Sequence, residues 1–468
     1  MTSTHTSDIA GTVHGLRDTF RAGTTKPLAW RLRQLDALEQ LVSSHEKEIA
    51  EALASDLGKP EAEAYLTETS FLLTEIRHTR RHLRRWAKAR HVAPPAALLP
   101  ATTSVIAEPL GVVLVMAPWN YPIQLLLAPA VGALAAGNCV VLSPSEVAPA
   151  SSHLMARLIP RYLDPVAVSV VEGGVDTKTE LLAQRFDHIF YTGNSTVGRI
   201  VMKAAAEHLT PVTLELGGKS PLYIDDSVDL SVAADRIVWG KFTNAGQTCV
   251  APDYILAPRL VADELAVHLR ASIDRMFGPS PAHGGRYGRI INTKHHDRLT
   301  AHLADLRDRG VTVLGGEHID RETRHMDPVI AVDVPWDASV MGEEIFGPIL
   351  PIVIVDSPSH AMSAINEREK PLALYVFSER TDVRRAFVRD TSSGALTFGL
   401  PVGHLAANQL PFGGVGESGM GAYHGRYSFE TFSHLKPVVS KPLQPDTMRM
   451  VYPPVSGEKL SWLRRILR

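Results

Sequence analysis

The sequence PVTLELGG, at residues 211–218, carries the clearest evidence for both the fold and the chemistry of this chain. Apolar side chains at Val212, Leu214 and Leu216 alternate with polar ones, which is typical of a β-strand with one buried face. Glu215 lies near the end of this strand, and the two glycines that follow predict a tight turn. Burying a carboxylate among apolar residues is unfavourable unless it has a partner or a function. Glu215 is therefore a candidate functional carboxylate, although an ordinary strand end would show the same pattern.

A cysteine follows further along the chain, in the sequence GQTC at residues 246–249. The small Gly246 and the polar Gln247 and Thr248 predict a turn that presents the thiol of Cys249. A thiol and a carboxylate together suggest nucleophilic catalysis, with the carboxylate as the base for a later step. A buried cysteine with a packing role is the alternative at this point.

The composition is typical of a soluble globular protein with substantial cores. The chain has 468 residues, of which 45% are hydrophobic, and its 50 acidic and 48 basic residues nearly balance, which argues against a nucleic-acid partner. The two cysteines, Cys139 and Cys249, cannot form a disulfide framework or a cysteine metal cluster, and no metal site is predicted. Residues 1–8 are polar and lack the features of a signal peptide. These features favour a reducing, cytoplasmic location.

From residue 111 onward, apolar strand patterns alternate with helical ones. Strands are predicted at residues 112–116, 139–142, 167–171, 189–191 and 211–216, with helices at 122–136, 151–162 and 197–207. This order predicts a parallel, doubly wound sheet, in which ligands bind at the carboxyl ends of the strands. The sequence YTGNSTVG at residues 191–198 follows a strand and opens a helix, so its amide groups could face a pyrophosphate. A glycine-containing turn without a ligand is an equally good interpretation of that motif alone.

The remaining segments complete the domain organisation. Residues 7–89 have helical periodicity, and a second α/β unit is predicted at about 220–394. The proline-containing residues 91–108 predict an excursion, in which residues 102–106 form an edge strand that pairs with another subunit. The glycine-rich residues 410–419 predict a close-packed loop at the junction of the two units.

Five motifs, in a characteristic order and spacing, give the chain a resemblance to a known family. They are PWN at residues 118–120, ELGGK at 215–219, GQTC at 246–249, EEIFGP at 343–348 and PFGG at 411–414. The chain resembles the aldehyde dehydrogenase superfamily over nearly its whole length. It is most similar to the class 3 branch, through YTGN at 191–194, NEREKPLA at 366–373 and YHG at 423–425.

The resemblance implies an α/β fold with two doubly wound domains, one for the cofactor and one for catalysis, and a small β arm for oligomerisation. It divides the chain into an NAD(P)-binding domain at 1–90 and 110–217, a catalytic domain at 218–415, oligomerisation segments at 91–109 and 416–440, and a tail at 441–468. The class 3 branch is typically dimeric, so a homodimer is expected.

The family's mechanism implies a role for three residues. Cys249 attacks the aldehyde carbon as a thiolate, and the Asn120 side-chain amide and the Cys249 backbone N–H stabilise the oxyanion that forms. Hydride transfer to nicotinamide leaves a thioester, and Glu215 activates the water that hydrolyses it to a carboxylic acid. The intact Glu215 argues against an acylating enzyme that would pass the thioester to phosphate or coenzyme A. A noncatalytic protein on the same scaffold is a further alternative, for which Ser143 is the only support.

The resemblance also implies a site for NAD or NADP. Trp119, Gly193, Asn194 and Gly198 are expected near the phosphates and the first helical turn, Glu146 and Glu344 on the riboses, and Phe346 against the nicotinamide. Ser143 departs from the family, which usually has a lysine here that helps hold the adenosine ribose or its 2′-phosphate. Because losing a cation weakens a phosphate contact more than a hydroxyl contact, we predict that NAD is preferred over NADP.

Substrate class follows from the resemblance alone. The class 3 branch oxidises hydrophobic aldehydes, medium- to long-chain aliphatic or aromatic. Tyr121 and Phe412 are candidate walls of the substrate pocket, and both are equally suited to a packing role. At the C-terminus, residues 456–468 combine helical apolar spacing with basic side chains. Weak contact with an anionic membrane is one interpretation, and a tail packed on its own dimer or frayed in solvent is the other.

Overall fold

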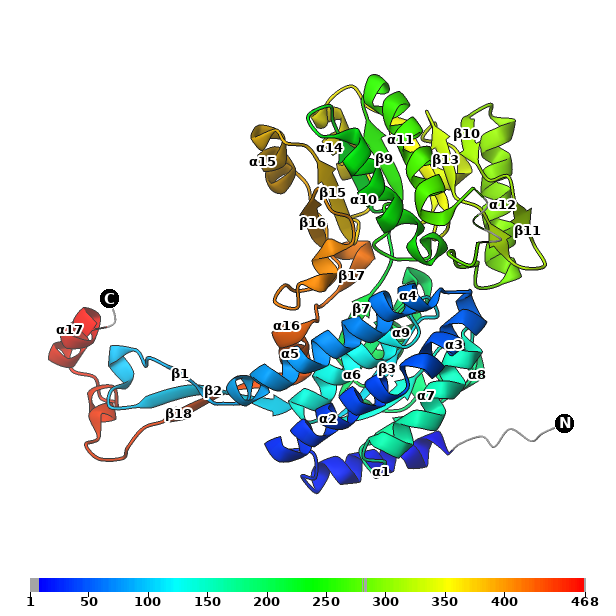
Figure 1. Ribbon diagram of the computed structural model, residues 1–468. Helices are drawn as coiled ribbons and strands as arrows, with labels where there is room; N and C mark the ends of the chain where they lie inside the picture. Colours follow the sequence, from blue (N-terminus) through cyan, green and yellow to red (C-terminus); the bar gives the residue numbers. More distant parts are fainter. Residues whose placement is uncertain (1–7, 280, 282–283, 467–468) are drawn as a thin grey trace.

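The computed structural model describes residues 8–279, 281 and 284–466 of the chain. Seven of the eight residues considered for a signal peptide lie outside this part, as do Leu467 and Arg468 of the tail. Figure 1 shows two α/β domains that stack on each other, and a narrow arm that leaves the first domain.

The first domain begins with the predicted helical segment, which the structure confirms. Its helices are α1 (Ile9–Arg21), α2 (Leu28–Ser44), α3 (Glu46–Leu57), α4 (Glu61–Ala64) and α5 (Ser70–Trp86), with a π-helical turn, Tyr65–Thr69, between α4 and α5. These helices bury apolar stripes such as Leu35, Leu38 and Leu41 of α2, while their charged faces meet solvent.

A six-stranded sheet forms the core of this domain, in the order β17-β7-β6-β3-β4-β5. The strands are β3 (Val112–Met116), β4 (Cys139–Ser143), β5 (Val168–Val170), β6 (His188–Thr192), β7 (Val212–Glu215) and β17 (Gly419–Met420). The connecting helices are α6 (Gln124–Ala136), α7 (Pro149–Tyr162), α8 (Val175–Leu182) and α9 (Ser195–Ala206). Strands β3 to β7 are parallel to one another, which confirms the predicted doubly wound sheet.

The second domain has a seven-stranded sheet in the order β10-β13-β14-β9-β8-β15-β16. Its strands are β8 (Pro221–Ile224), β9 (Tyr254–Ala257), β10 (Thr312–Gly315), β13 (Val329–Val332), β14 (Ile349–Ile354), β15 (Ala373–Phe377) and β16 (Ala395–Phe398). The helices include α10 (Leu230–Phe242), α11 (Arg259–Phe277), α12 (Thr293–Asp308), α14 (Pro358–Asn366) and α15 (Thr381–Asp390). The turn from β7 to β8 crosses between the two sheets.

The glycine-rich segment after residue 410 returns the chain to the first sheet. Its end forms β17, which pairs antiparallel with β7, with Gly419 opposite Glu215. Gly419 has a φ of 140°, and a Cβ there would lie 2.2 Å from the Leu214 carbonyl oxygen, so only glycine fits this approach. The predicted close-packed loop, residues 410–419, therefore ends at the first residue of a strand of the first sheet, directly beside the candidate carboxylate.

The arm is a three-stranded antiparallel sheet of β1 (Arg90–Val92), β2 (Thr102–Pro109) and β18 (Ser433–Ser440). The prediction that residues 102–106 form an edge strand is wrong, because β2 lies between β1 and β18. Its partner β18 comes from more than 300 residues further along the chain (433 − 109 = 324), which local periodicity cannot reveal. Within the described residues, β18 pairs on one side only.

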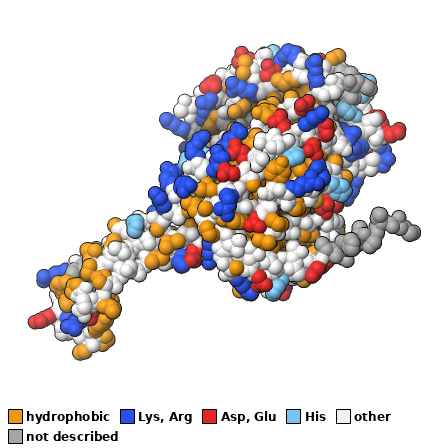
Figure 2. Space-filling view, turned by 60° about the horizontal axis from the view of Figure 1, so that its bottom comes forward, with side chains coloured by type: hydrophobic (Ala, Val, Ile, Leu, Met, Phe, Trp, Pro, Cys, Tyr) orange, Lys and Arg blue, Asp and Glu red, His pale blue; other side chains and the backbone are white. Residues whose placement is uncertain are grey.

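The arm ends in the C-terminal helix α17 (Gly457–Ile466), as the spacing in the tail predicted. Figure 2 shows hydrophobic side chains gathered at this end of the molecule. Among residues 8–279, 281 and 284–466, every helix is too short or too polar to cross a membrane.

Candidate active site

The carboxyl edge of the first sheet collects the site residues predicted in this domain. Trp119 and Asn120 follow β3, Ser143 ends β4, Gly193 follows β6, and Glu215 ends β7. Because these strands are parallel neighbours, their carboxyl ends share one edge. The second domain adds Cys249 and the segment 343–348 through the loops that follow α10 and precede β14.

Glu215 is buried and without a hydrogen-bonding partner. The residue is 2% exposed, and neither carboxylate oxygen has a partner within the described part of the chain. Burial raises the pKa of Glu215 well above its ordinary value, because an ion is less stable away from water. A buried carboxylate without a structural partner is expected where the group has a chemical role.

A left-handed turn carries Cys249. After α10, Asn244, Ala245 and Gly246 all have positive φ, of 56°, 52° and 76°. Such backbone is unfavourable for non-glycine residues and is found at functional sites. A Cβ on Gly246 would lie 2.2 Å from the Gly347 carbonyl oxygen, so this glycine is required.

Gln247 holds this turn in place. Its side-chain amide donates to the carbonyl oxygens of Asn244 (3.0 Å) and Arg289 (3.1 Å), and its side-chain oxygen accepts from the N–H of Ile291 (2.9 Å). The hydrogen bonds of the Gln247 side chain thus fix the turn that carries Cys249.

The surroundings of Cys249 keep its thiol protonated. Burial raises the pKa of Cys249 to about 12, and the negative charges of Glu344 and Glu215 add to the effect. The N–H groups of Cys249 and Val250 act in the opposite direction. The same charges show that the thiol and the two carboxylates share one site, and that the thiolate predicted for catalysis is not the form favoured here.

Asn120 joins the two domains beside this turn. Its side-chain Nδ2 donates to the Gln247 carbonyl oxygen at 3.0 Å, and its own carbonyl oxygen accepts from Asn244 Nδ2 at 2.9 Å. The residue is 2% exposed. One N–H of the Asn120 amide is thereby used, and among the described residues no acceptor is found for the second, which could bind a ligand.

A buried ion pair beneath Asn120 was missed from the sequence. Lys59 Nζ donates to Glu68 Oε1 at 2.7 Å, and both side chains are fully buried. Glu68 Oε2 accepts from the N–H groups of Ile123 and Gln124 at 3.0 Å each, which caps the start of α6. Lys59 also lies 3.4 Å from the Asn120 carbonyl oxygen. Glu68 points inward from the π-helical turn, which a 3.6-residue periodicity does not reveal.

Glu344 and Phe346 approach from the second domain. Burial raises the pKa of Glu344 to about 8, and the Gly218 N–H donates to its carboxylate. A Cβ on Gly217 would lie 2.0 Å from Glu344 Oε2, so the first glycine after Glu215 makes room for this carboxylate. Phe346 meets Trp119 edge to face, with ring centroids 5.3 Å apart.

The predicted cofactor residues fit a dinucleotide. The Ser143 hydroxyl is buried at the carboxyl end of β4, with no partner among the described residues, as suits a ligand hydroxyl. Helix α9 begins after Gly193, and the Asn194 side chain caps it by accepting from the Val197 N–H at 2.9 Å. Gly198 lets α9 approach Leu216, since a Cβ there would lie 2.9 Å from a Leu216 methyl group.

Glu146 has a partner that the sequence did not reveal. Lys178 Nζ, from helix α8, donates to Glu146 Oε2. The prediction that NAD is preferred rested on the loss of a cation at Ser143. The structure shows that this edge of the sheet has a cation all the same.

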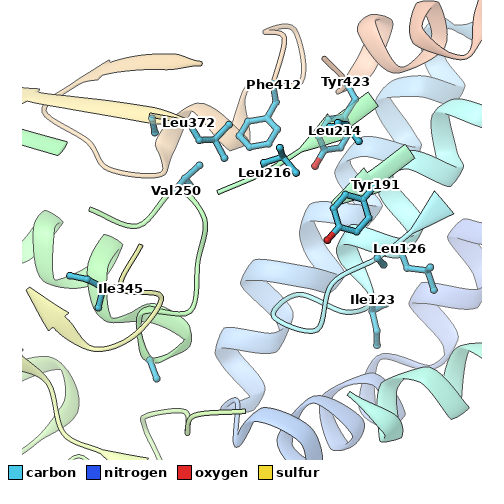
Figure 3. Close-up of a cluster of buried hydrophobic side chains, with 14 of the residues drawn as sticks. Ile123, Leu126, Tyr191, Leu214, Leu216, Val250, Ile345, Leu372, Phe412 and Tyr423 are labelled. Atoms are coloured by element: carbon cyan, nitrogen blue, oxygen red, sulfur yellow. The ribbon is translucent and has the colours of Figure 1, made fainter. Parts of the chain in front are cut away.

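The two candidate pocket residues differ in their contacts. The Tyr121 hydroxyl hydrogen-bonds to Thr248 Oγ1 at 2.6 Å, next to Cys249, and Lys59 lies 4.2 Å from the centre of the Tyr121 ring. Phe412 is 6% exposed and stacks against His404 and His424. Figure 3 shows Phe412 beside Leu216 and Leu372, in an apolar cluster to which both domains contribute.

Comparisons with known proteins identify the family of the chain. The sequence model of the aldehyde dehydrogenase family matches residues 2–438. Aldehyde dehydrogenase family 3 member A2 of Rattus norvegicus is 47% identical over 456 residues, covering 97% of this chain and 93% of that protein. The dimeric NADP-preferring aldehyde dehydrogenase of Rattus norvegicus is 48% identical over 449 residues, covering 96% of this chain and 98% of that protein.

A solved structure shows the same fold throughout. The substrate-bound AldH of Staphylococcus aureus superposes with a TM-score of 0.95 at 40% sequence identity, covering 98% of this chain and 99% of that one. The chain belongs to the aldehyde dehydrogenase family and is an NAD(P)-dependent oxidoreductase of that family.

Proposed function

We propose that this enzyme oxidises hydrophobic aldehydes to carboxylic acids, with Cys249 as nucleophile, Glu215 as general base and Asn120 as oxyanion donor. The observation that carries the proposal is the convergence of a thiol and an unpartnered buried carboxylate, from different domains, beside a side-chain amide with a free N–H. An apolar aldehyde suits the site, because Tyr121 and the cluster that contains Phe412 line this region with aromatic and aliphatic surface.

In the first step, the Cys249 thiol gives up its proton to water, its sulfur attacks the carbonyl carbon, and the carbonyl oxygen becomes an oxyanion. The free N–H of Asn120 and the Cys249 backbone N–H are the donors for that oxyanion. A donor of this kind stabilises a transition state by about 3 kcal/mol. When bound, the cofactor would supply the hydride acceptor, and loss of hydride from the adduct would leave the acyl group as a thioester on Cys249.

Glu215 acts in the second step. Its carboxylate takes a proton from water, and the hydroxide attacks the thioester carbon. The bond to sulfur then breaks, the acid is released, and the proton held by Glu215 passes to the sulfur, which restores the thiol and the carboxylate. The raised pKa of Glu215 makes it a stronger base than an ordinary carboxylate once it has lost its proton. A base of this kind typically contributes about 10²–10⁴-fold to the rate.

Glu344 connects cofactor binding to the nucleophile. Its negative charge is one cause of the raised pKa of Cys249. Glu344 would hold a nicotinamide ribose through its carboxylate, and a ribose hydroxyl that donates to this group would lessen its influence on Cys249, whose pKa is raised mainly by burial.

The test measures reduced nicotinamide and the acid product with a panel of aliphatic and aromatic aldehydes, beside a Cys249→Ala control. Turnover should increase with aldehyde hydrophobicity and be absent in the control. Product that appears as an acyl phosphate or a coenzyme A thioester, instead of the free acid, would point to an acylating enzyme. Turnover that survives Cys249→Ala would refute the assignment of the nucleophile.

We also propose a homodimer held through the arm. Leu435 and Val439 lie on one face of β18 and are 45% and 58% exposed, and the outer edge of this strand has free backbone groups within the described residues. The name of a 48% identical relative includes the word dimeric. Light scattering after size exclusion should give a dimer mass for the native chain and a monomer mass for Val439→Asp. Val388→Asp, at a site on α15 with 62% exposure, is the matched control and should leave the mass unchanged.

The tail and the location of the protein complete the proposal. Helix α17 exposes Leu460 (43%) and Trp462 (44%) among basic residues, which supports weak contact with an anionic bilayer. Co-sedimentation with anionic liposomes should be lost on truncation after Pro454, and equal sedimentation of both forms would contradict the contact. A cytoplasmic location agrees with two free cysteines, and microscopy of a tagged chain would check it.

A further inference from the structure

Lys178 occupies a place at the sheet edge that the catalytic steps do not explain. Strand β5, which precedes α8, is the parallel neighbour of β4, which precedes Glu146. The Lys178 ammonium therefore reaches Glu146 from the adjacent crossover, and the two side chains are only 21% and 37% exposed. Ser143, with its buried and unpartnered hydroxyl, ends the same strand β4.

The charges at this edge of the sheet suit an adenosine whose ribose carries a 2′-phosphate. In a doubly wound sheet, an acidic side chain at this edge accepts from the ribose 2′-hydroxyl, and a basic one accommodates a 2′-phosphate. Glu146 alone would repel a phosphate, which carries about −1.5 to −2 charge. Lys178 neutralises Glu146 and adds a donor of its own.

An exposed apolar residue lies on the same face of α8. Val175 is 74% exposed and precedes Lys178 by three residues, so the two side chains are neighbours on the helix surface. Apolar surface of this kind is suited to stack against a base. The adjacent Glu172 is engaged elsewhere, through Ser152 Oγ and His153, and does not compete for the Lys178 ammonium.

We propose that Lys178 determines cofactor specificity, by supplying the cation that Ser143 lacks. Glu146 accepts from the 2′-hydroxyl of NAD, and Lys178 pairs with the 2′-phosphate of NADP, so that the chain binds both dinucleotides. This inference rests on the proposed function, because it assumes that the dinucleotide binds at this edge of the sheet. It replaces the preference for NAD that Ser143 alone had suggested.

The experiment uses fragments of the cofactor, so that binding is measured without turnover. Titration calorimetry would compare 2′,5′-ADP with 5′-AMP for the native chain, Lys178→Met and Lys178→Arg. Lys47→Met is the matched control, because Lys47 also faces a glutamate, Glu51, but on the exposed surface of α3. Thermal unfolding of each variant would show that it is folded.

Lys178→Met should weaken 2′,5′-ADP about 10- to 100-fold, the loss expected for a hydrogen bond to a charged group, and leave 5′-AMP within about two-fold. Lys178→Arg should retain most of the affinity, and Lys47→Met all of it. In the native chain, added salt should weaken 2′,5′-ADP more than 5′-AMP. If Lys178→Met weakened both fragments equally, or neither, the inference about Lys178 would be overturned. Binding of 5′-AMP to the native chain would in that case still support the cofactor site. A native chain that binds neither fragment would overturn the cofactor site itself.

Discussion

Replacing Glu68 by Gln should destabilise the first domain by about 3–5 kcal/mol, which is the usual cost of removing one partner from a buried ion pair. The side chains of Lys59 and Glu68 are fully buried, and their charged atoms are 2.7 Å apart. A Gln at this position can still accept from the Ile123 and Gln124 N–H groups, but its amide turns a donor toward the Lys59 ammonium. Lys59 then loses the carboxylate that is hydrogen-bonded to it, and the more distant Glu63 is the carboxylate that still interacts with its charge.

The converse change should cost less. In Lys59→Met, the Glu68 carboxylate keeps two backbone donors at the start of α6, where negative charge is favourable. The double variant Lys59→Met with Glu68→Gln leaves neither member of the pair charged, so its loss should fall short of the sum of the single losses by about 0.5–3 kcal/mol. Lys47→Met breaks an exposed pair with Glu51 and should cost less than about 1 kcal/mol.

Urea denaturation followed by circular dichroism would give these free energies of unfolding. The catalytic rate is a second measurement, because Lys59 also contacts the Asn120 carbonyl oxygen. A shift of the oxyanion donor by about 1 Å can lower the rate by about 10²-fold. Losses in Glu68→Gln and Lys59→Met no larger than that in Lys47→Met would refute the reasoning. So would strictly additive losses in the double variant.

Three further outcomes follow from the structure. Burial raises the pKa of Glu75 to about 7, so the folded state holds this proton more tightly than the unfolded state does. The stabilisation from the bound proton is complete below pH 4.5 and is lost as pH rises through about 7. The free energy of unfolding falls by roughly 3 kcal/mol over this range. Glu75→Gln should therefore show a smaller loss of melting temperature between pH 5 and 8 than the native chain, and parallel pH profiles would contradict this. Gly419→Ala should lower both melting temperature and turnover, because its Cβ would lie 2.2 Å from the Leu214 carbonyl oxygen, whereas Gly15→Ala, with nothing within 4 Å, should be neutral or stabilising. Glu215→Gln should give a single-turnover burst of reduced nicotinamide, followed by turnover about 10²–10⁴-fold slower than that of the native chain. In the native chain, hydrolysis of the thioester should speed up as pH rises through the raised pKa of Glu215. A variant that shows no burst and turns over at the native rate would show that Glu215 is not the base.

The sequence by itself determined the elements whose signal is local. Strand β3 has the predicted bounds, Val112–Met116, because five consecutive apolar residues between turn signals suit a strand buried on both faces. Glu215 and Cys249 were recognised as a chemical pair from their neighbours in the chain. Glycines at 217 and 246 marked the turns beside them, and in both places the structure shows that a Cβ would collide with an oxygen atom.

Only the tertiary structure decided which distant residues meet. The position of β2 inside the arm depends on β18, and the cation beside Glu146 depends on Lys178 of another crossover. The buried pair of Lys59 and Glu68 likewise depends on a π-helical turn that rotates Glu68 inward. Periodicity reports how residues a few positions apart share a face, whereas ion pairs and strand pairing depend on distance in space, which the packing of the whole chain sets.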